Sequence, residues 1–443
     1  MSDPKVSEML ARIKTDNVKF IRLQFNDILG IPKNVAMPVI QAEKALTEGI
    51  WIDGSSIEGF ARIDESDMIL KPDMDTYQIL PWRPSEKREA RFICDVYTYG
   101  DKPFEGDPRF VLKKNLHEAA KLGFVFNVGP ELEFFVFKRN EKGQATTEFV
   151  DYGGYFDLAP SDAAEDLRRE IVLALTDMGF EIEASHHEVA ESQHEIDFKY
   201  GEALSVADKV ITFKFAAKTL ALMSGMHATF MAKPIGKISG TGMHTHGSLS
   251  KDGKNIFFDP KADNQLSETM IYYIGGLMTH AKALARLGNP TINSYKRLVP
   301  GYEAPVYITW SAANRSAMIR VPAARGNSTR AELRSPDPTC NPYLLFAGMI
   351  AAGLDGIKNK ILPPPATDVN IYRLSDEERK KRGIEMLPGS LIEANDELLK
   401  DKVICDALGS HIVENLTKIA IAENDEFRLT VHPWEVERYI NNF

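Results

Sequence analysis

The segment GPELEFFVF (residues 129–137) places two glutamates in one of the most apolar runs of the chain. In a β-strand, residues i and i+2 share a face, so Glu131 and Glu133 would point the same way, roughly 7 Å apart, beside Phe135 and Phe137. Two carboxylates on a partly buried face repel each other and lose hydration. Such a pair persists if it is solvated after all, if one member is protonated, or if a cation lies between the two. The segment therefore predicts a strand and leaves these three possibilities open.

Length, composition and charge indicate a chain of more than one domain. With 443 residues, 44% of them apolar and 26% charged, the chain exceeds one typical hydrophobic core and resembles ordinary soluble proteins. Its longest apolar run, YLLFAGMIAAGL (residues 343–354), is too short to span a membrane and fits a core helix. The net charge of −10 disfavours general nucleic-acid binding.

The cysteines and the first residues bear on the compartment. Cys94, Cys340 and Cys405 form neither an even set nor a CxxC pair, which argues against a disulfide framework and against a thiolate metal site. The opening segment MSDPKVSEML lacks the apolar centre of a signal peptide. We therefore expect a cytoplasmic protein.

A stretch rich in turn-forming residues, YGDKPFEGDPR (residues 99–109), indicates a boundary between two domains. Before it we expect the strands VKFIRLQF, IPKNVAMPV and ARFICDVYT, with little helical signal. Beyond it, Asp107 opens a helix that Gly123 closes, and Ser161 and Gly179 bound a second one. The patterns predict helices over residues 108–122, 162–178, 203–223, 265–287 and 341–360.

The segment EIEASHHEVAESQHEIDFKY (residues 181–200) carries two separated carboxylates. Glu188 ends one extended stretch and Glu195 begins the next, with a turn-like AESQ between them. A hairpin would bring the two side chains together. On its own, a solvated acidic hairpin is the simpler interpretation, and a metal site is the alternative.

A glycine-flanked pair of histidines lies in SGTGMHTHGSLS (residues 239–250). The glycines allow close backbone approach, and His244, His246 and Ser248 fall on one strand face. A single histidine on a strand usually only forms hydrogen bonds, whereas a glycine-flanked HxH is a better candidate for ligation.

Arginines flank a glutamate in STRAELRSPDP (residues 328–338), where Arg330, Glu332 and Arg334 share one face. Such a pattern can be a surface ion-pair ladder of little consequence. It can also be a carboxylate between two fixed cations suited to phosphate or carboxylate. Further arginines crowd the preceding stretch: Arg297, Arg315 and Arg320.

Together the strands supply a ligand set that consists mostly of oxygen atoms. Its members are Glu131, Glu133, Glu188, Glu195, His244 and Glu332. Hard ligands of this kind suit Mg²⁺ or Mn²⁺ rather than structural zinc, and six of them are enough for two ions. Paired divalent ions beside arginines are typical of phosphoryl transfer, where metals and guanidinium groups offset charge on the transferring group.

These motifs resemble bacterial type I glutamine synthetase along almost the whole chain. They are, in order, DGSSIEGF, GPELEFFVF, EASHHEVA, GTGMHTHGSL, NSYKRLVPGYEAP, NRS, AELRSPDP and NPYL. The resemblance implies an α+β fold, with a small N-terminal β-grasp domain over residues 14–102 and a catalytic domain over residues 107–443, whose antiparallel sheet is flanked by helices. It also implies ATP-dependent ligation of glutamate and ammonia to glutamine through γ-glutamyl phosphate, in nitrogen assimilation.

The resemblance assigns roles residue by residue. One metal ion would be held by Glu133, Glu188 and Glu195, and the other by Glu131, His244 and Glu332. The positions for ATP are Glu183, His246, Ser248, Arg315 and Arg320. The positions around glutamate are Ser239, Gly240, Arg297, Glu303 and Arg334. Asp53 would help to deprotonate ammonium, Glu303 would act beside it, and Arg315 would lie near both phosphate and substrate.

Two features concern the subgroup. Ser239 stands where the family often has asparagine, and its shorter side chain could loosen the grip on glutamate. The chain lacks the insert of the longer, adenylylated subgroup, although Tyr372 lies where that subgroup's modified tyrosine would be. The chain thus resembles the shorter alpha subgroup, in which glutamine inhibits the enzyme by feedback and Arg62 has a regulatory role.

The resemblance further implies a homododecamer of two stacked six-membered rings, without direct nucleic-acid or membrane binding. One alternative is a paralogue that ligates a polyamine to glutamate. Retention of Asp53, Glu303 and the matched arginines favours ammonia instead. Another alternative is a nitrogen-sensing oligomer that binds transcription regulators, through a segment such as the tail HPWEVERYINNF.

Overall fold

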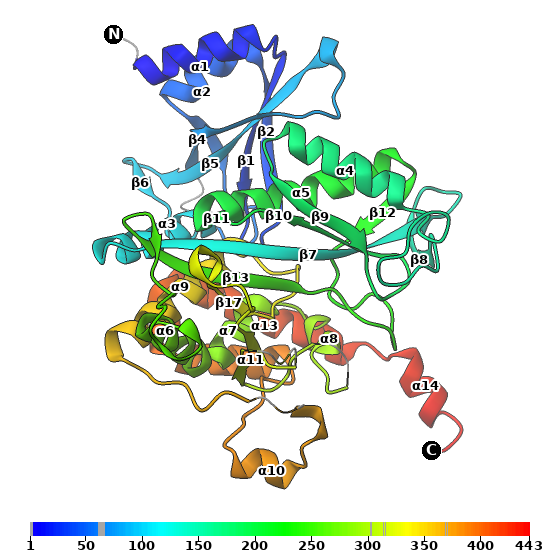
Figure 1. The fold of residues 1–443 in the computed structure, drawn as a ribbon. Coiled ribbons are helices and arrows are strands. Elements are labelled where there is room, and N and C mark those ends of the chain that lie inside the picture. The colour runs from blue at the N-terminus through cyan, green and yellow to red at the C-terminus, as the bar shows by residue number, and fades with distance from the viewer. Residues whose placement is uncertain are drawn as a thin grey trace.

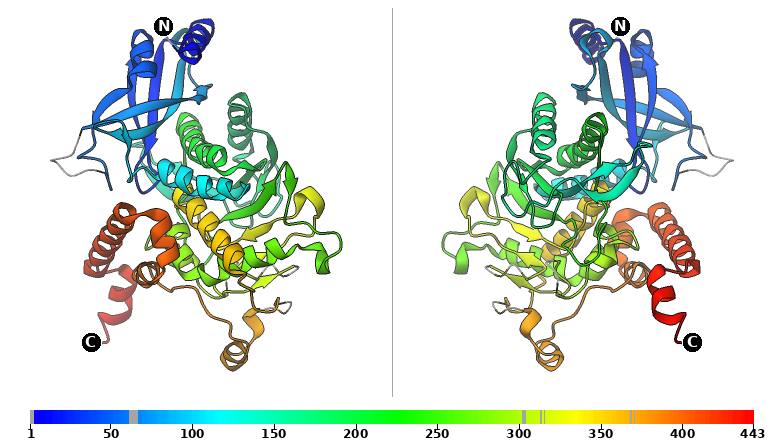
Figure 2. Two further views of the ribbon diagram at one scale, coloured as in Figure 1. Left: turned by 90° about the vertical axis from the view of Figure 1, so that its left-hand side faces the viewer. Right: turned by 90° about the vertical axis from the view of Figure 1, so that its right-hand side faces the viewer.

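The computed structural model describes residues 3–60, 67–301, 304–312, 314, 316–367, 369 and 371–443. Arg62, Glu303 and Arg315, which carry expected roles, lie outside the described residues. Figure 1 shows a small N-terminal domain stacked on a larger domain, and Figure 2 shows the same two layers from either side.

The N-terminal domain is a sheet packed against two helices (Figure 1). The strand order is β2-β1-β5-β4-β3, with β6 paired to β5. β1 is parallel to β5, and the other pairs are antiparallel. The elements are α1 (Pro4–Thr15), β1 (Phe20–Asn26), β2 (Pro32–Pro38), α2 (Ala42–Thr47), β3 (Ile50–Asp53), β4 (Asp67–Ile79), β5 (Glu89–Thr98) and β6 (Lys102–Pro103), with 3₁₀ turns Val39–Gln41 and Ser85–Lys87.

The expected strands of this domain are present, but the expectation of little helix was wrong. Helix α1 begins after Asp3, whose side chain accepts a hydrogen bond from the backbone N of Lys5. Its buried residues Val6, Met9 and Ile13 recur at helical spacing, and Met9 and Ile13 pack in the core of this domain. The helical signal was therefore in the sequence, in a helix too short to stand out.

The larger domain is built on a long mixed sheet with the order β15-β16-β17-β13-β7-β10-β9. All pairs along this path are antiparallel except β15 and β16. The strands are β7 (Val125–Arg139), β9 (Ile182–His187), β10 (Gln193–Phe198), β13 (Met243–Lys251), β15 (Trp310–Ser311), β16 (Ile319–Arg320) and β17 (Ala331–Leu333), with short partners β8 (Ala145–Phe149), β11 (Gly201–Glu202), β12 (Met226–Thr229) and β14 (Lys254–Asn255).

Helices cover this sheet and complete one large hydrophobic core (Figure 1). They are α3 (Pro108–Lys121), α4 (Glu165–Asp177), α5 (Ala203–Met223), α6 (Glu268–Thr279), α7 (Ala281–Gly288), α8 (Ser294–Arg297), α9 (Pro342–Asn359), α10 (Asp376–Lys381), α11 (Leu391–Lys400), α12 (Lys402–Leu408), α13 (Ser410–Leu429) and α14 (Pro433–Tyr439), with 3₁₀ turns Asp263–Gln265, Gly326–Ser328 and Ile371–Arg373. No helix in the described part of the chain has the length and apolarity needed to cross a membrane.

Two expected helices differ from the structure. Helix α4 begins at Glu165 rather than near Ser161, because Asp162 turns inward and pairs with Arg168. The helix expected over residues 265–287 is divided at His280, whose two ring nitrogens bond to carboxylates of other helices. In both places a buried polar contact, rather than local propensity, sets the helix end.

Buried polar contacts join the two domains within one chain. Arg109 of α3 pairs with Asp208 of α5 at 2.9 Å, and also with Asp73 and Asp95 of the N-terminal strands at 2.8 and 2.6 Å. The amide of Asn341, the N-cap of α9, donates to backbone oxygens of the β1–β2 loop. These contacts hold the N-terminal domain on its own catalytic domain.

Candidate active site

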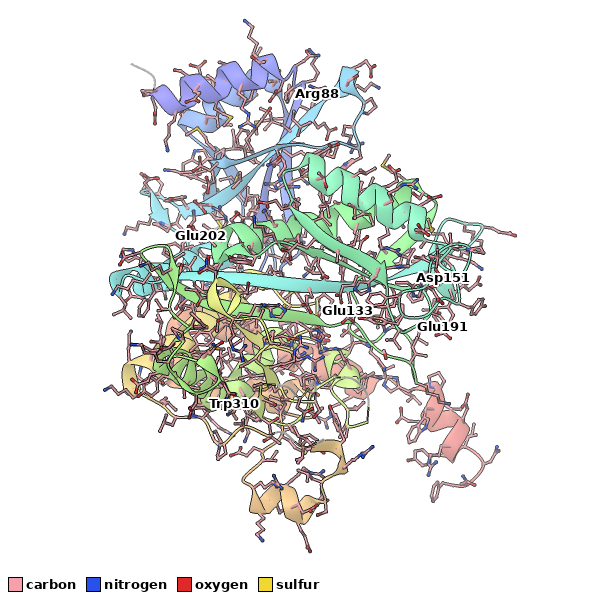
Figure 3. The ribbon with its side chains drawn as sticks, viewed as in Figure 1. Arg88, Glu133, Asp151, Glu191, Glu202 and Trp310 are labelled. Atoms are coloured by element: carbon pink, nitrogen blue, oxygen red, sulfur yellow. The ribbon has the colours of Figure 1, made fainter. Side chains whose placement is uncertain are left out.

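The central strand β7 carries Glu131 and Glu133 into the middle of the large sheet. Figure 3 labels Glu133 on this strand. Glu131 lies opposite His244 of β13 on one side and Asp197 of β10 on the other. Glu133 lies opposite Glu195 of β10. Because cross-strand neighbours share a face, these side chains gather on one side of the sheet.

The first group of side chains surrounds Glu131. Its Oε1 lies 2.7 Å from Nε2 of His246, and its Oε2 lies 3.3 Å from Nδ1 of His244. Glu332 of β17 is 1% exposed, with Oε1 3.9 Å from the same Nδ1. Ligand atoms of Glu131, His246 and Glu332 lie within 4.8 Å of one another, close enough to share a metal ion.

The hydrogen bonds distinguish the two histidines of this group. Arg330 donates from Nε to Nδ1 of His246 at 3.1 Å, so the hydrogen of that ring is on Nε2, facing Glu131. A ring nitrogen that bears hydrogen cannot bind a metal. His244, which contacts both Glu131 and Glu332, is therefore the better candidate ligand of the two, and its role as a ligand stays a prediction.

The second group lies where the β9–β10 hairpin meets β7. Nε2 of His186 lies 3.5 Å from Oε1 of Glu195, and Nδ1 lies 3.6 Å from Oε1 of Glu188. Ligand atoms of these three residues lie within 4.8 Å of one another. Glu133 joins them from β7, and its Oε2 accepts a hydrogen bond from Nε2 of Gln193 at 2.8 Å. The expected hairpin thus brings Glu188 and Glu195 together.

Glu131 and Glu332, the two carboxyl groups of the first group, are held in their charged form. Burial alone would raise the pKa of Glu131, but hydrogen bonds from His244 and His246 outweigh burial and lower that pKa. Burial likewise opposes the charge of Glu332, whose pKa is lowered by the nearby histidines and by Arg334.

The group around Glu133 has the opposite electrostatics. Burial, and then the charges of Glu195 and Glu188, raise the pKa of Glu133 well above its ordinary value. Burial, followed by the charge of Asp197, raises the pKa of Glu195 to about 10. Carboxylates that repel one another in this way would be relieved by a cation between them.

A cavity of about 340 Å³ opens beside the first group. It is lined by three residues expected to meet a nucleotide, namely Glu183, His246 and Ser248, together with Arg330. Arg320, also expected there, pairs with Glu332 beside Arg334. The rest of the wall includes Asn127, Val128, Asp197, Phe198 and Tyr200.

A smaller cavity, of about 40 Å³, lies beside the second group. Its lining contains the expected substrate residues Ser239, Gly240, Arg297 and Arg334, together with Glu133, Glu188, Gln193, Lys233, His244 and Ala304. Arg297 is 4% exposed and donates to the backbone oxygen of Ser335 at 2.7 Å. A Cβ atom on Gly240 would lie 2.3 Å from the backbone oxygen of Ala232, so only glycine fits there.

Comparison with known proteins agrees with this geometry. The model of the glutamine synthetase catalytic domain matches residues 105–439, and that of the glutamine synthetase β-grasp domain matches residues 17–99. The chain belongs to the glutamine synthetase family. Glutamine synthetase of Methanosarcina mazei is 56% identical over 98% of this chain and 97% of its own length, and that of Thermus thermophilus is 56% identical over 99% of each.

Solved structures of similar proteins share the whole fold. A chain described as a GmaS/ADP complex has a TM-score of 0.89 at 31% identity and covers 100% of both chains. A Plasmodium falciparum glutamine synthetase has a TM-score of 0.88 at 27% identity and covers 99% of both. The α+β fold expected from the sequence, with its β-grasp domain, is confirmed.

In this member of the glutamine synthetase family, one of the expected site residues that the structure describes lies in the N-terminal domain. Asp53 is exposed at the end of β3, and its Oδ1 accepts a hydrogen bond from the backbone N of Ser55 at 2.8 Å. The two cavities described above are lined by residues 127–334. Within the described residues, the structure therefore does not bring Asp53 into the wall of either cavity.

Several residues of the site were not expected from the sequence. Gln193 and Asp197 flank Glu195 at i−2 and i+2 and share its strand face. His186 lies two residues before Glu188 and joins the second group. Lys233 enters the small cavity from a loop. Strand alternation could have revealed the first three, whereas no local pattern indicates Lys233.

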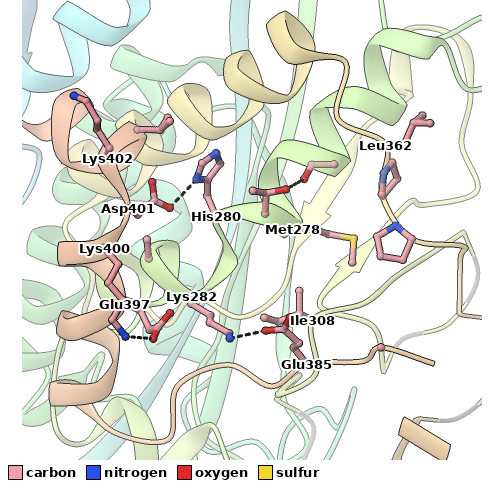
Figure 4. A pocket seen from close by; sticks show the side chains of 17 residues that line it. Met278, His280, Lys282, Ile308, Leu362, Glu385, Glu397, Lys400, Asp401 and Lys402 are labelled. Carbon is pink, nitrogen blue, oxygen red and sulfur yellow. Dashed lines mark hydrogen bonds and ion pairs between the residues drawn. The ribbon is translucent and has the colours of Figure 1, made fainter. Parts of the chain in front are cut away.

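A further cavity, of about 600 Å³, lies at the junction of α6 and α7 (Figure 4). Lys282 pairs there with Glu385 at 2.5 Å, and Lys400 pairs with Glu397 at 2.8 Å. This cavity shares no residue with those beside Glu131 and Glu133. We therefore assign it no part in the reaction.

Proposed function

We propose that the chain ligates glutamate and ammonia to glutamine with ATP, through γ-glutamyl phosphate. The observation that carries this proposal is the pair of carboxylate groups on one face of β7. One group adjoins the cavity of about 340 Å³, and the other adjoins the small cavity lined by arginines. ATP in the first cavity and glutamate in the second would meet between Glu131 and Glu133. The 56% identity to curated glutamine synthetases supports the same reaction.

The donor set fits two divalent ions. Carboxylate oxygens with one histidine suit Mg²⁺ or Mn²⁺. Burial, and then the charges of neighbouring carboxylates, raise the pKa values of Glu133 and Glu195, and a cation between these groups would offset both effects. Glu133, Glu188 and Glu195 would hold one ion, and Glu131, His244 and Glu332 would hold the other. When bound, the ions would offset negative charge on the phosphate groups of ATP.

The chain's own side chains would bind and orient both substrates. ATP would contact Glu183, His246, Ser248, Arg315 and Arg320. Glutamate would contact Ser239, Gly240, Arg297, Glu303 and Arg334. Ammonium must lose a proton before it attacks, and Asp53 or Glu303 would accept that proton. Glu303 would also close over the acyl phosphate and exclude water.

A neighbouring copy of the chain would complete the site. Asp53 is exposed on β3, and both cavities are lined by residues of the larger domain. A head-to-tail contact would bring Asp53 of one copy to the cavities of the next, and such contacts close into a ring. Two stacked rings of six are part of this proposal.

Regulation is a further part of the proposal. Arg62→Ala should weaken inhibition by glutamine while leaving the forward rate nearly unchanged, because the resemblance gives Arg62 a regulatory role. Glutamine inhibition curves that match wild type would contradict this role. Transcription regulators could bind at α14 and its C-cap, where Trp434 and Ile440 are 60% and 69% exposed.

The decisive experiment measures phosphate release from ATP with glutamate, with and without ammonium, and with a polyamine in place of ammonium. We expect phosphate and glutamine in equal amounts with ammonium, and no activity in Glu332→Ala. Equal release with the polyamine would favour the polyamine ligase instead. No phosphate release with either amine would favour the nitrogen-sensing oligomer.

A further inference from the structure

The strands that lead to Glu188 and Glu195 have a second face, which packs on a buried polar cluster. This hairpin cluster consists of Asp151, Asp162, Arg168, His187 and His194, each at least nine-tenths buried. His187 and His194 are directly paired across β9 and β10, and their rings lie 5.0 Å apart. Because successive residues of a strand point to opposite faces, the cluster lies behind the two glutamates.

Asp151 holds the turn of the hairpin, near Glu191 (Figure 3). Its Oδ1 accepts a hydrogen bond from the backbone N of Ser192 at 2.9 Å and lies 3.0 Å from Nε2 of His187. Ser192 is buried with a φ of 59°, in the left-handed region that is unfavourable for serine. Its Oγ accepts from the backbone N of Val150 at 2.8 Å. These bonds maintain a strained turn between the two glutamates.

Arg168 of α4 holds the other strand of the hairpin. Its Nη1 contacts Oδ2 of Asp162 and lies 3.0 Å from Nδ1 of His194. A guanidinium group only donates hydrogen bonds, so Nδ1 of His194 accepts and its Nε2 carries the hydrogen. That nitrogen cannot bind a metal ion.

The cluster has the composition of a metal site but the hydrogen bonds of a closed network. Asp151, Asp162, His187 and His194 offer ligand atoms within 4.8 Å of one another. However, Asp162 is paired with Arg168, and His194 presents an N–H. Within the described residues, Nε2 of His194 and Oδ2 of Asp151 have no hydrogen-bond partner. One is a donor and the other an acceptor, so one buried water could satisfy both.

We propose that the hairpin cluster fixes the spacing of Glu188 and Glu195, and that Asp151, Arg168 and His194 are positioning residues. The inference rests on the proposed metal role of the two glutamates. Like-charged carboxylates separate unless the backbone holds them, and the cluster restrains both the turn and the strand that carry them. Loss of the cluster should weaken the binding of the ion held by Glu133, Glu188 and Glu195. The affinity for the other ion should stay nearly unchanged.

The test is calorimetric titration of Mn²⁺ into the full-length wild type, Asp151→Ala and Asp151→Asn. Asparagine keeps an acceptor for the backbone N of Ser192, whereas alanine does not. We expect Asp151→Ala to lower the affinity for one of two Mn²⁺ ions by about tenfold or more, as is typical for residues that support metal ligands. Asp151→Asn should lower this affinity less. The affinity for the second ion should change by less than about twofold in either variant. At saturating Mn²⁺, kcat should recover towards the wild-type value.

His280→Asn is the matched control, because His280 is another buried histidine between two carboxylates, Asp355 and Asp401 (Figure 4). It should lower the thermal midpoint without changing either Mn²⁺ affinity. Arg168→Lys keeps the charge but removes the guanidinium Nη1 that contacts both Asp162 and His194, so it provides the test if Asp151→Ala does not fold.

Unchanged Mn²⁺ affinities in Asp151→Ala and Arg168→Lys would overturn the proposal. If Asp151→Ala does not fold, unchanged affinities in Arg168→Lys alone would overturn it. A third Mn²⁺ in the wild type that Asp151→Asn removes would also overturn it, because the cluster would then bind metal itself. If Glu133→Ala removes no Mn²⁺, the metal assignment of the proposed function fails, and the role of the cluster fails with it.

Discussion

At the scale of single residues, Glu131 and Glu133 are neighbours on one strand with opposite surroundings. Hydrogen bonds from His244 and His246 overcome burial and lower the pKa of Glu131, whereas burial and nearby carboxylates raise the pKa of Glu133. The sequence left open whether this pair is solvated, has one protonated member or has a cation between its members, and the two different surroundings narrow that choice. Glu131 is stabilised in its charged form by its histidines, whereas Glu133 would take up a proton unless a cation lies beside it.

We expect Glu131→Ala and Glu133→Ala both to abolish synthesis, each by removing a ligand of a different ion. Each variant should bind one fewer Mn²⁺ tightly than wild type, with a different residual affinity, in calorimetric titration. Glu141→Ala, which changes an exposed glutamate of the turn after β7, is the control and should match wild type. The same number of bound ions in both variants as in wild type would refute the assignment.

Gly240 provides a second residue-scale prediction. A methyl group there would lie 2.3 Å from the backbone oxygen of Ala232, so Gly240→Ala must displace the loop that lines the small cavity. We expect the KM for glutamate to rise about tenfold or more, a loss of about 1.4 kcal/mol in binding, with a smaller change for ATP. Gly236→Ala, in the same loop with nothing within 4 Å, should behave as wild type. Equal KM values would contradict a tight fit at Gly240.

At the scale of elements, buried polar contacts rather than propensity decide where helices end. The apolar pattern continues through His280, yet α6 and α7 are separated there. Nδ1 of His280 lies 2.6 Å from Asp401, the N-cap of α12, and Nε2 lies 3.2 Å from Asp355 of α9. One histidine thereby links the junction of α6 and α7 to α9 and α12.

This junction should make stability depend on pH. Burial alone would lower the pKa of His280, but Asp401 and Asp355 raise it above the ordinary value. The folded state then retains a proton that the unfolded chain releases, so the contribution is complete below about pH 6.5 and is lost as pH rises through the raised pKa. His280→Asn should cost about 1–3 kcal/mol at about pH 6 and less at about pH 8.5. Thermal midpoints that differ from wild type equally at both pH values would contradict this.

At the scale of the whole molecule, each chain holds its N-terminal domain firmly. Arg109 pairs with three carboxylates from both domains, and Ile28 of the β1–β2 loop is buried in the core of the larger domain. Breaking such a buried pair leaves charges without partners, which is costly. Asp53 is therefore not expected to swing onto the cavities of its own chain.

The shared-site proposal predicts complementation. Asp53→Ala and Arg297→Ala should each be inactive alone, and their co-assembled mixture should regain activity. Random mixing in equal amounts would leave about a quarter of the shared sites with both residues intact, one from each neighbour. If each site came from one chain, every site would carry a defect. Activity no higher than the average of the parents, in rings shown to be mixed, would reject the shared site.

The sequence by itself determined the local geometry and the chemistry of this protein. Alternation placed Glu131 and Glu133 on one face of β7, the turn at AESQ predicted the β9–β10 hairpin, and caps such as Asp107 marked helix ends. Only the tertiary structure decided that β10 and β13 flank β7, that His280 divides a helix, and that a buried cluster lies behind Glu188. The reason is physical. Backbone sterics and periodicity act over a few residues, whereas strand order and buried ion pairs depend on residues that meet only when the chain packs.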